Sequence, residues 1–185
     1  MHPATATYLI TWVCYGTWLP GESGAVPRKL NQFGAPLPES DQNREQQSRD
    51  RMRQQPYQLD TIRREIVLNT LREVCAWRGW TLWAAHVRTN HVHAVIAANC
   101  PPEVVMDDLK AYSSRALNAY RLDCPERRRW ARHGSTRYLW NANAIQSAMQ
   151  YVIHEQGEPM AAFERLVLHA AQHHAGMPVA DREDA

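Results

Sequence analysis

The sequence predicts an α+β fold: a ferredoxin-like, split βαβ antiparallel sheet with helices on one face, plus a long loop insertion after the first strand. Apolar strand-like runs and helix-like periodicity follow one another as strand, helix, strand, strand, helix, short strand, helix. Only three residues separate the two central strands, as expected for a hairpin. The length of 185 residues suits one domain with a sizeable core.

The first strand and the insertion differ sharply in composition. Residues 7–18, TYLITWVCYGTW, form a short run of β-branched and aromatic residues that is typical of a buried strand. Residues 19–57 contain five prolines and long polar runs with little apolar periodicity. This segment is predicted to be a loop insertion with a short polar helix at its end.

Three helices are predicted from their apolar spacing and their end signals. The first starts at Asp60 or Thr61 and stops at Gly79, and the third runs from about residue 143 to 156 and stops at Gly157. The second starts after Pro101 and Pro102 and covers residues 103–120. The expected buried faces are Ile62, Ile66, Leu68, Leu71, Val74 and Cys75 in the first helix, and Val104, Val105, Leu109, Tyr112 and Leu117 in the second.

The remaining strands are short. Residues 81–87 and 91–98 are predicted to form a β-hairpin around Arg88, Thr89 and Asn90, and RYLW, residues 137–140, a short later strand. We therefore expect one domain over residues 1–165, with the insertion at 19–57, and a flexible tail over residues 166–185.

Composition narrows the function classes. The chain is 44% hydrophobic and 22% charged, as in soluble globular proteins. It has no run of about 18 apolar residues, and its start lacks the pattern of a signal peptide, so we expect a cytoplasmic protein without a membrane partner. The four cysteines form no C-x-x-C pair, which favours reduced thiols over a zinc or disulfide framework.

Positive charge is concentrated between Lys110 and Arg137, a segment that contains eight lysines and arginines but only two acidic residues. Aromatic residues interleave with these charges, a mixture that suits DNA backbone phosphates together with stacked bases. A solvated basic loop beside a core helix would have the same composition. The candidate DNA-binding residues are Lys110, Arg115, Arg128, Arg129, Arg137 and Trp140.

Two histidines stand in a predicted strand. His91 and His93 are two residues apart in RTNHVHAVIAA, so their side chains share one face of the strand. Two imidazoles so placed can bind one cation. The alternative is a pair of core histidines satisfied by hydrogen bonds.

The third helix offers an oxygen ligand and a phenol. Tyr151 and Glu155 are four residues apart, about 40° around a helix, so both face one way. Glu155 would complete a metal site of two histidines and one oxygen. Gln156 lies about 140° from Tyr151 on the same helical wheel, which makes it the poorer ligand. Such a donor set suits Mg²⁺ or Mn²⁺.

These motifs together resemble the HUH single-tyrosine DNA transposases, which include the insertion-sequence and REP-associated tyrosine transposases of the IS200-like family. NHVHAVI is similar to their H-hydrophobic-H strand, LKAYSSRALNAY to their middle helix and YVIHEQGE to their nucleophile helix. The resemblance covers residues 7–18 and 61–158. Two features depart from the family: a glutamate at position 155, where an amide is usual, and the insertion.

The resemblance implies a metal-dependent enzyme that acts in DNA transposition and recombination on single-stranded or hairpin DNA, the palindromic ends of a mobile element. It assigns His91, His93 and Glu155, or else Gln156, to the metal and Tyr151 to nucleophilic attack. The attack would give a 5′-phosphotyrosine and a free 3′-hydroxyl, followed by strand transfer. A tyrosine phenol is mostly protonated at neutral pH and needs help from the cation.

Several alternatives stay open at this stage. Tyr112, beside Ser113 and Ser114, is a rival nucleophile without an oxygen ligand one turn on. A relaxase or replication-initiator endonuclease would use the same chemistry, although such proteins are usually longer. A non-catalytic hairpin-DNA-binding protein, or a domesticated regulator on the same fold, would use the histidines structurally. A monomer and a homodimer with exchanged helices both fit this length.

Overall fold

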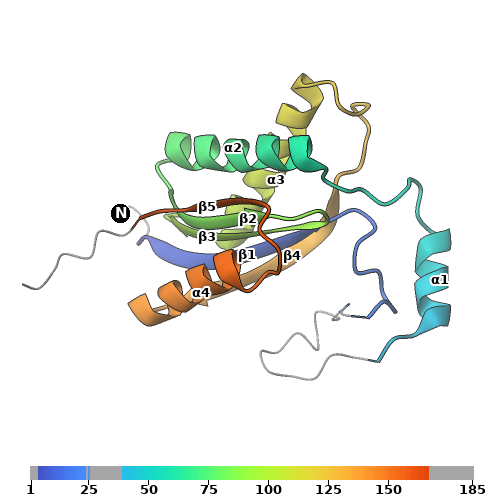
Figure 1. The fold of residues 1–185 in the computed structure, drawn as a ribbon, viewed down its shortest axis with the longest axis horizontal. Helices are drawn as coiled ribbons and strands as arrows, with labels where there is room; N and C mark the ends of the chain where they lie inside the picture. Colours follow the sequence, from blue (N-terminus) through green and yellow to red (C-terminus); the bar gives the residue numbers. More distant parts are fainter. Residues whose placement is uncertain (1–3, 24, 26–38, 167–185) are drawn as a thin grey trace, which may run out of the picture.

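A five-stranded antiparallel sheet forms the centre of the computed structural model, which describes residues 4–23, 25 and 39–166 (Figure 1). The strand order is β4-β1-β3-β2-β5. Its first four members have the order of the split βαβ arrangement, which confirms the predicted fold class. The strands are β1 (Ala6–Cys14), β2 (Thr81–Val87), β3 (His91–Ala98), β4 (Trp130–Leu139) and β5 (Ala161–Glu164).

Two helices cover one face of this sheet. They are α2 (Thr61–Arg78) and α3 (Pro102–Ala119), close to their predicted bounds (Figure 1). The Asp60 side chain caps α2 by accepting from Arg63 N, and Gly79 ends it with φ +69°. Ile62 and Val104, which we expected on the apolar faces, are exposed, because each lies in the first turn of its helix on the solvent side.

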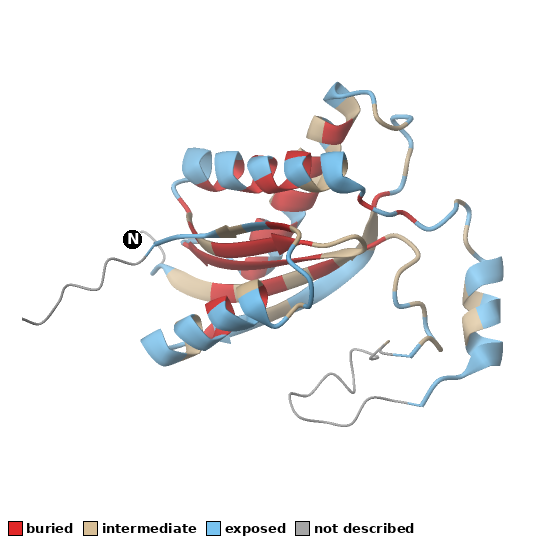
Figure 2. Ribbon diagram, in the orientation of Figure 1, coloured by how far each residue is buried: buried red, intermediate tan, exposed pale blue. Residues whose placement is uncertain are grey.

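The other face carries α4 (Ala142–His154), so the expectation of helices on a single face holds only for α2 and α3 (Figure 1). Six buried residues form the contact: Ala148, Met149 and Val152 of α4 with Ala84, Val95 and Leu139 of the sheet. Figure 2 shows the central strands buried between the helices. After His91, every residue of β3 is buried, as in a strand covered on both faces.

The strand β4 is longer than predicted and is an edge strand paired with β1. Residues 130–136, which precede the predicted strand at 137–140, therefore also belong to β4. The short strand β5 was not predicted; its four residues pair with β2. Four residues are too few to show a period, so the sequence carries little sign of it.

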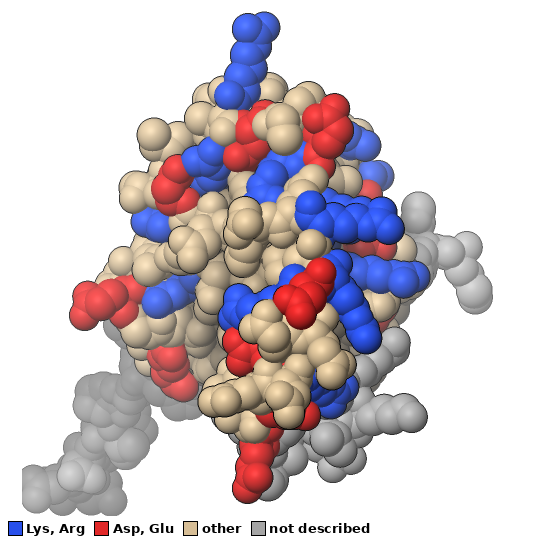
Figure 3. All heavy atoms as spheres, turned by 90° about the vertical axis from the view of Figure 1, so that its right-hand side faces the viewer, with Lys and Arg blue, Asp and Glu red and all other residues tan. Residues whose placement is uncertain are grey.

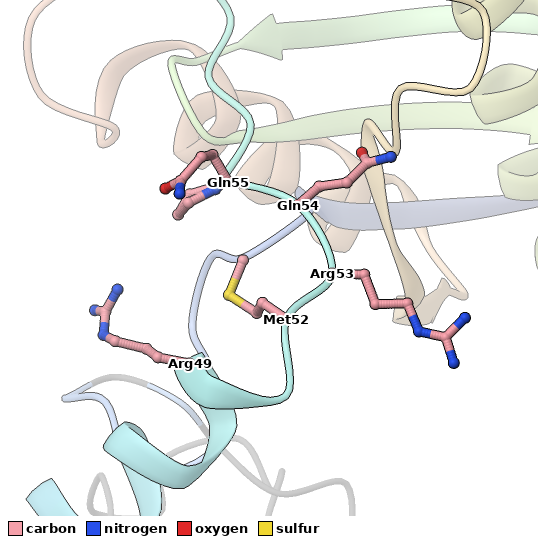
Figure 4. Close-up of a pocket in the computed structure, with 6 residues that line it drawn as sticks. Arg49, Met52, Arg53, Gln54 and Gln55 are labelled. Carbon is pink, nitrogen blue, oxygen red and sulfur yellow. The ribbon is translucent and has the colours of Figure 1, made fainter.

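The insertion contains the predicted polar helix, α1 (Gln42–Asp50), none of whose residues is buried. Arg127 ties the end of the insertion to the loop before β4 by hydrogen bonds to Gln54, Gln55 and Pro56. A hollow of about 450 Å³ beside α1 is lined by Arg49, Met52, Arg53, Gln54, Gln55 and Pro56 (Figure 4). No candidate catalytic residue lines this hollow. Of the predicted tail, residues 167–185 lie outside the described residues.

In the described part of the chain, no helix combines the length and apolar character needed to cross a bilayer.

Candidate active site

The strand histidines project from the sheet face that α4 covers. His93 pairs with Thr11 of β1, and Val92 turns its side chain into the core on the α2 and α3 side. The two imidazole rings lie with their centroids 4.7 Å apart. Residues two apart on a strand therefore bring the two imidazole rings side by side on one face, as the sequence pattern predicted.

Hydrogen bonds at Nδ1 orient both rings. His91 Nδ1 lies 2.7 Å from Asn90 Oδ1, and His93 Nδ1 lies 2.7 Å from Thr11 Oγ1. When Nδ1 donates to these oxygens, Nε2 of each ring keeps its lone pair. A partner that fixes one ring nitrogen so that the other can bind a metal is the usual arrangement in metal sites.

Burial keeps both imidazoles neutral. Desolvation lowers the pKa of His91 to about 4, and the positive charge of Arg88 adds to this effect. Desolvation also lowers the pKa of His93 to about 3, with a further contribution from His91. At neutral pH both side chains are thus in the uncharged form that a cation requires of its histidine ligands.

The α4 helix brings Tyr151 to the same place. Val152 is fully buried against the sheet, so its neighbour Tyr151 lies at the edge of the packed face and remains 39% exposed. The Tyr151 and His93 ring centroids are 5.6 Å apart at an interplanar angle of 75°. Both imidazoles and the phenol ring therefore converge on one small site, although about sixty residues separate them in the chain.

Of the two candidate oxygen ligands, Gln156 rather than Glu155 lies beside the histidine pair. The Gln156 side chain lies close enough to His91 and His93 to act on the pKa of both rings, raising it slightly, and its Nε2 donates to the Tyr151 carbonyl oxygen at 3.2 Å. Glu155 is exposed at the C-cap of α4. The preference for Glu155 assumed a helix that continues to residue 156, but α4 ends at His154, so helical spacing does not apply to Gln156.

The side chains present suit a divalent cation of the Mg²⁺ or Mn²⁺ type. Two neutral imidazoles and an amide that faces them supply nitrogen and oxygen donors. Within the described ranges, no three His, Cys, Asp or Glu side chains gather as a metal site, so Glu155 does not join the histidine pair. In this arrangement the third protein ligand would be the Gln156 amide oxygen.

His86 holds the end of α4 against the sheet. Its buried ring donates from Nδ1 to the Val152 carbonyl at 2.9 Å and accepts at Nε2 from Met160 N at 3.2 Å. Val152 lies in the last turn of α4, where carbonyls have no partner within the helix. One neutral tautomer makes both bonds, and burial lowers the pKa of His86 accordingly.

Replacement of His86 by leucine is expected to lower the free energy of unfolding by about 2 kcal/mol, because two backbone groups lose their partner. The measurement is urea denaturation. His154→Leu, at an exposed position on α4, is the control and should change the free energy of unfolding by less than about 0.5 kcal/mol. Equal effects of the two changes would show that His86 does not anchor the helix.

Two further residues at the site, Trp18 and Arg88, were not predicted from the sequence. The Trp18 ring centroid lies 5.2 Å from that of His91. Arg88, in the turn of the β2–β3 hairpin, contributes a positive charge beside both histidines and donates to the Glu158 carbonyl oxygen. The Arg88 signal was available in principle, since a basic residue in a hairpin turn lies near the first residue of the next strand.

Two of the candidate DNA-binding residues are buried and have structural contacts. Lys110 is 8% exposed and its Nζ donates to the carbonyl oxygens of Ala131 and His133. Arg129 is 3% exposed, donates to Asn118 and forms an ion pair with Asp123. These contacts correct the prediction for both residues, because a buried side chain does not reach a DNA backbone.

The other four candidates are exposed but not gathered. Arg115 lies over the Tyr112 ring on α3, across the sheet from α4, and Arg128 over the Tyr15 ring. Trp140 stacks on Tyr138. Tyr138 pairs with Tyr8 of β1, whose side chain lies in the core on the sheet face that α2 and α3 cover. Arg137 pairs in register with Leu9, which packs on the α4 side.

Of the six, Arg137 therefore lies on the same sheet face as the histidines. Figure 3 shows that, on the face at the right of Figure 1, basic side chains are interspersed with acidic ones.

Removal of the Arg129 guanidinium should destabilise the fold. In Arg129→Met, the half-buried Asp123 carboxylate loses one of its two arginine partners, and we expect the free energy of unfolding to fall by about 3 kcal/mol. The adjacent, exposed Arg128→Met is the matched control and should change stability by under about 0.5 kcal/mol. Thermal unfolding of both variants measures the difference. A stable Arg129→Met with weakened DNA binding would restore the original prediction.

The family model described as Transposase IS200 like matches residues 49–154, a span that holds His91, His93 and Tyr151. A solved structure described as a REP-associated tyrosine transposase bound to a REP hairpin is similar at 12% identity and a TM-score of 0.47. The alignment covers 80% of this chain but only 64% of that one. No curated protein matches the chain.

Proposed function

The chain belongs to the IS200-like transposase family, and on this premise we propose that it cleaves and rejoins single-stranded DNA with Tyr151 as the nucleophile. The observation that carries the proposal is the convergence of Tyr151, His93 and His91 at ring separations of 5.6 and 4.7 Å. The substrate is single-stranded or hairpin DNA with palindromic element ends.

The proposed step is an attack on a backbone phosphate. Tyr151 Oη forms a bond to phosphorus while the bond from phosphorus to the 3′ oxygen breaks. The phenol loses its proton, and the departing 3′ oxygen takes one up to become a free hydroxyl. The product is a 5′-phosphotyrosine, which keeps the energy of the phosphodiester, so the 3′-hydroxyl of another strand can reverse the step and join DNA.

His91, His93 and Gln156 are proposed to hold the divalent cation, Mg²⁺ or Mn²⁺. When bound, it neutralises charge on the non-bridging phosphate oxygens. Asn90 and Thr11 keep the two imidazoles turned toward the phosphate site. His86 and the buried residue Val152 keep Tyr151 beside His93. Arg88 adds positive charge near the phosphate.

The proposal is tested with hairpin-containing DNA strands from either side of the gene, each labelled at one end. With Mg²⁺ or Mn²⁺, a 3′-labelled strand should become covalently attached to the protein on a denaturing gel. A 5′-labelled strand should give a shorter fragment that a polymerase can extend. Chelation of the metal should abolish both products. Tight hairpin binding without any adduct would instead favour a DNA-binding protein.

The third ligand is decided by a pair of neighbouring substitutions. Gln156→Ala should lower the rate of adduct formation by about 10- to 100-fold and weaken Mn²⁺ binding, since the amide faces both imidazoles. Glu155→Ala, one residue away and exposed, should change the rate by less than about 2-fold. The reverse order of effects would return the ligand role to Glu155.

A further inference from the structure

Four aromatic rings follow one another across the candidate site. Tyr151 contacts His93, His93 contacts His91, and His91 contacts Trp18. The Trp18 and His91 ring centroids are 5.2 Å apart, with the ring planes inclined by 34°. Tyr151 and Trp18 are therefore placed against different members of the histidine pair.

The turn after β1 holds Trp18 in this position. Gly16 has φ +80°, and the Thr17 amide donates to the Cys14 carbonyl at 3.2 Å, which closes a tight turn. Beyond it, Leu19 N donates to Glu22 Oε2 at 3.0 Å. Trp18 itself has φ +51°, a left-handed conformation that is unfavourable for a bulky residue. Such strain persists where the surroundings impose it and is common at ligand sites.

The Trp18 indole is accessible to solvent. Its side chain is 41% exposed, whereas Trp12, six residues earlier in β1, is fully buried. An indole that contacts a metal-ligand imidazole on one side and solvent on the other presents a flat apolar surface next to the phosphate position. Aromatic rings of this kind bind unpaired nucleobases by stacking, with little dependence on which base it is.

We propose that Trp18 is a stacking platform for an unpaired base adjacent to the scissile phosphate. This inference rests on the proposed function and adds a binding site for one nucleotide. A phosphate held over His91 and His93 lies between Tyr151 and Trp18, and a neighbouring base then reaches the indole. Trp18 fixes where the strand enters the site, which positions the scissile bond for Tyr151.

The test combines Trp18 variants with strands that lack single bases. Trp18→Ala should weaken binding of the cleavable strand by about 10-fold, and Trp18→Phe should retain most of the affinity. Removal of one particular base beside the cleavage position should weaken wild-type binding by a similar factor. That same abasic strand should bind Trp18→Ala with no further loss, because the two changes remove one contact. Binding is measured by fluorescence anisotropy in the Tyr151→Phe background.

Trp77→Ala is the matched control, because Trp77 is 66% exposed and lies on α2, across the sheet from the site. Equal losses for Trp77→Ala and Trp18→Ala would overturn the inference, as would additive losses at every abasic position. A loss of Mn²⁺ affinity without DNA would overturn it as well, since Trp18 would then only support His91. If Trp18→Ala forms the adduct normally and binds DNA with unchanged affinity, the stacking role of Trp18 is refuted while the proposed cleavage chemistry stands. If the losses from Trp18→Ala and from the abasic strand are non-additive but the wild type forms no adduct, the proposed cleavage chemistry is refuted while the stacking role of Trp18 stands.

Discussion

Tyr151→Phe is expected to abolish the covalent protein–DNA adduct and to lower strand cleavage by at least about 1,000-fold. The substitution removes only the hydroxyl, so the ring contact with His93 at 5.6 Å and the packing of α4 remain. DNA affinity and the unfolding temperature should stay close to those of wild type. The measurement is a denaturing gel with 3′-labelled hairpin DNA and Mn²⁺.

Tyr112→Phe is the matched control, because the sequence left Tyr112 as a rival nucleophile. The structure places Tyr112 half-buried on α3, with its ring 5.8 Å from that of Trp77 and beneath Arg115. The α3 helix lies on the sheet face opposite to α4, so this phenol is remote from the histidine pair. The adduct should form at the wild-type rate in Tyr112→Phe. Its loss there, with survival in Tyr151→Phe, would reverse the assignment.

Local signals were sufficient for much of the fold. The bounds of α2 followed from Asp60 and Gly79, whose side-chain cap and left-handed backbone act within a few residues of the helix ends. The β2–β3 hairpin followed from two apolar runs around a three-residue turn. The shared face of His91 and His93 followed from strand periodicity alone, which no tertiary contact alters.

Tertiary packing decided what the sequence could not. The basic character of residues 110–137 did not distinguish a lysine that caps strand carbonyls from one that faces DNA, and Lys110 is of the first kind. The choice between Glu155 and Gln156 depended on where α4 ends, and helix ends are the least predictable part of an element. Trp18 contacts His91 because the turn after β1 reverses the chain, and the sequence pattern did not indicate the course of that turn.

His93→Ala should abolish the metal response of the protein. Wild type should unfold at a higher temperature when Mn²⁺ is added, because ligand binding stabilises the folded state, whereas His93→Ala should show no shift. Adduct formation should fall by more than about 100-fold. His91→Ala should behave in the same way, since each variant leaves the cation one imidazole short. The readouts are thermal unfolding with and without Mn²⁺ and the denaturing gel.

His154→Ala serves as the control for a histidine close to the site that is not a proposed ligand. It is exposed at the end of α4, three residues from Tyr151, and should keep both the Mn²⁺ shift and the adduct. His93 is buried and bonded to Thr11, so His93→Ala also changes stability without metal, and the shift on adding Mn²⁺ separates the two effects. A full Mn²⁺ shift in His93→Ala would mean that the cation binds elsewhere. The histidine pair would then be a hydrogen-bonded part of the core. Tyr151 would need another source of positive charge, for which Arg88, whose charge acts on both histidines, is a candidate.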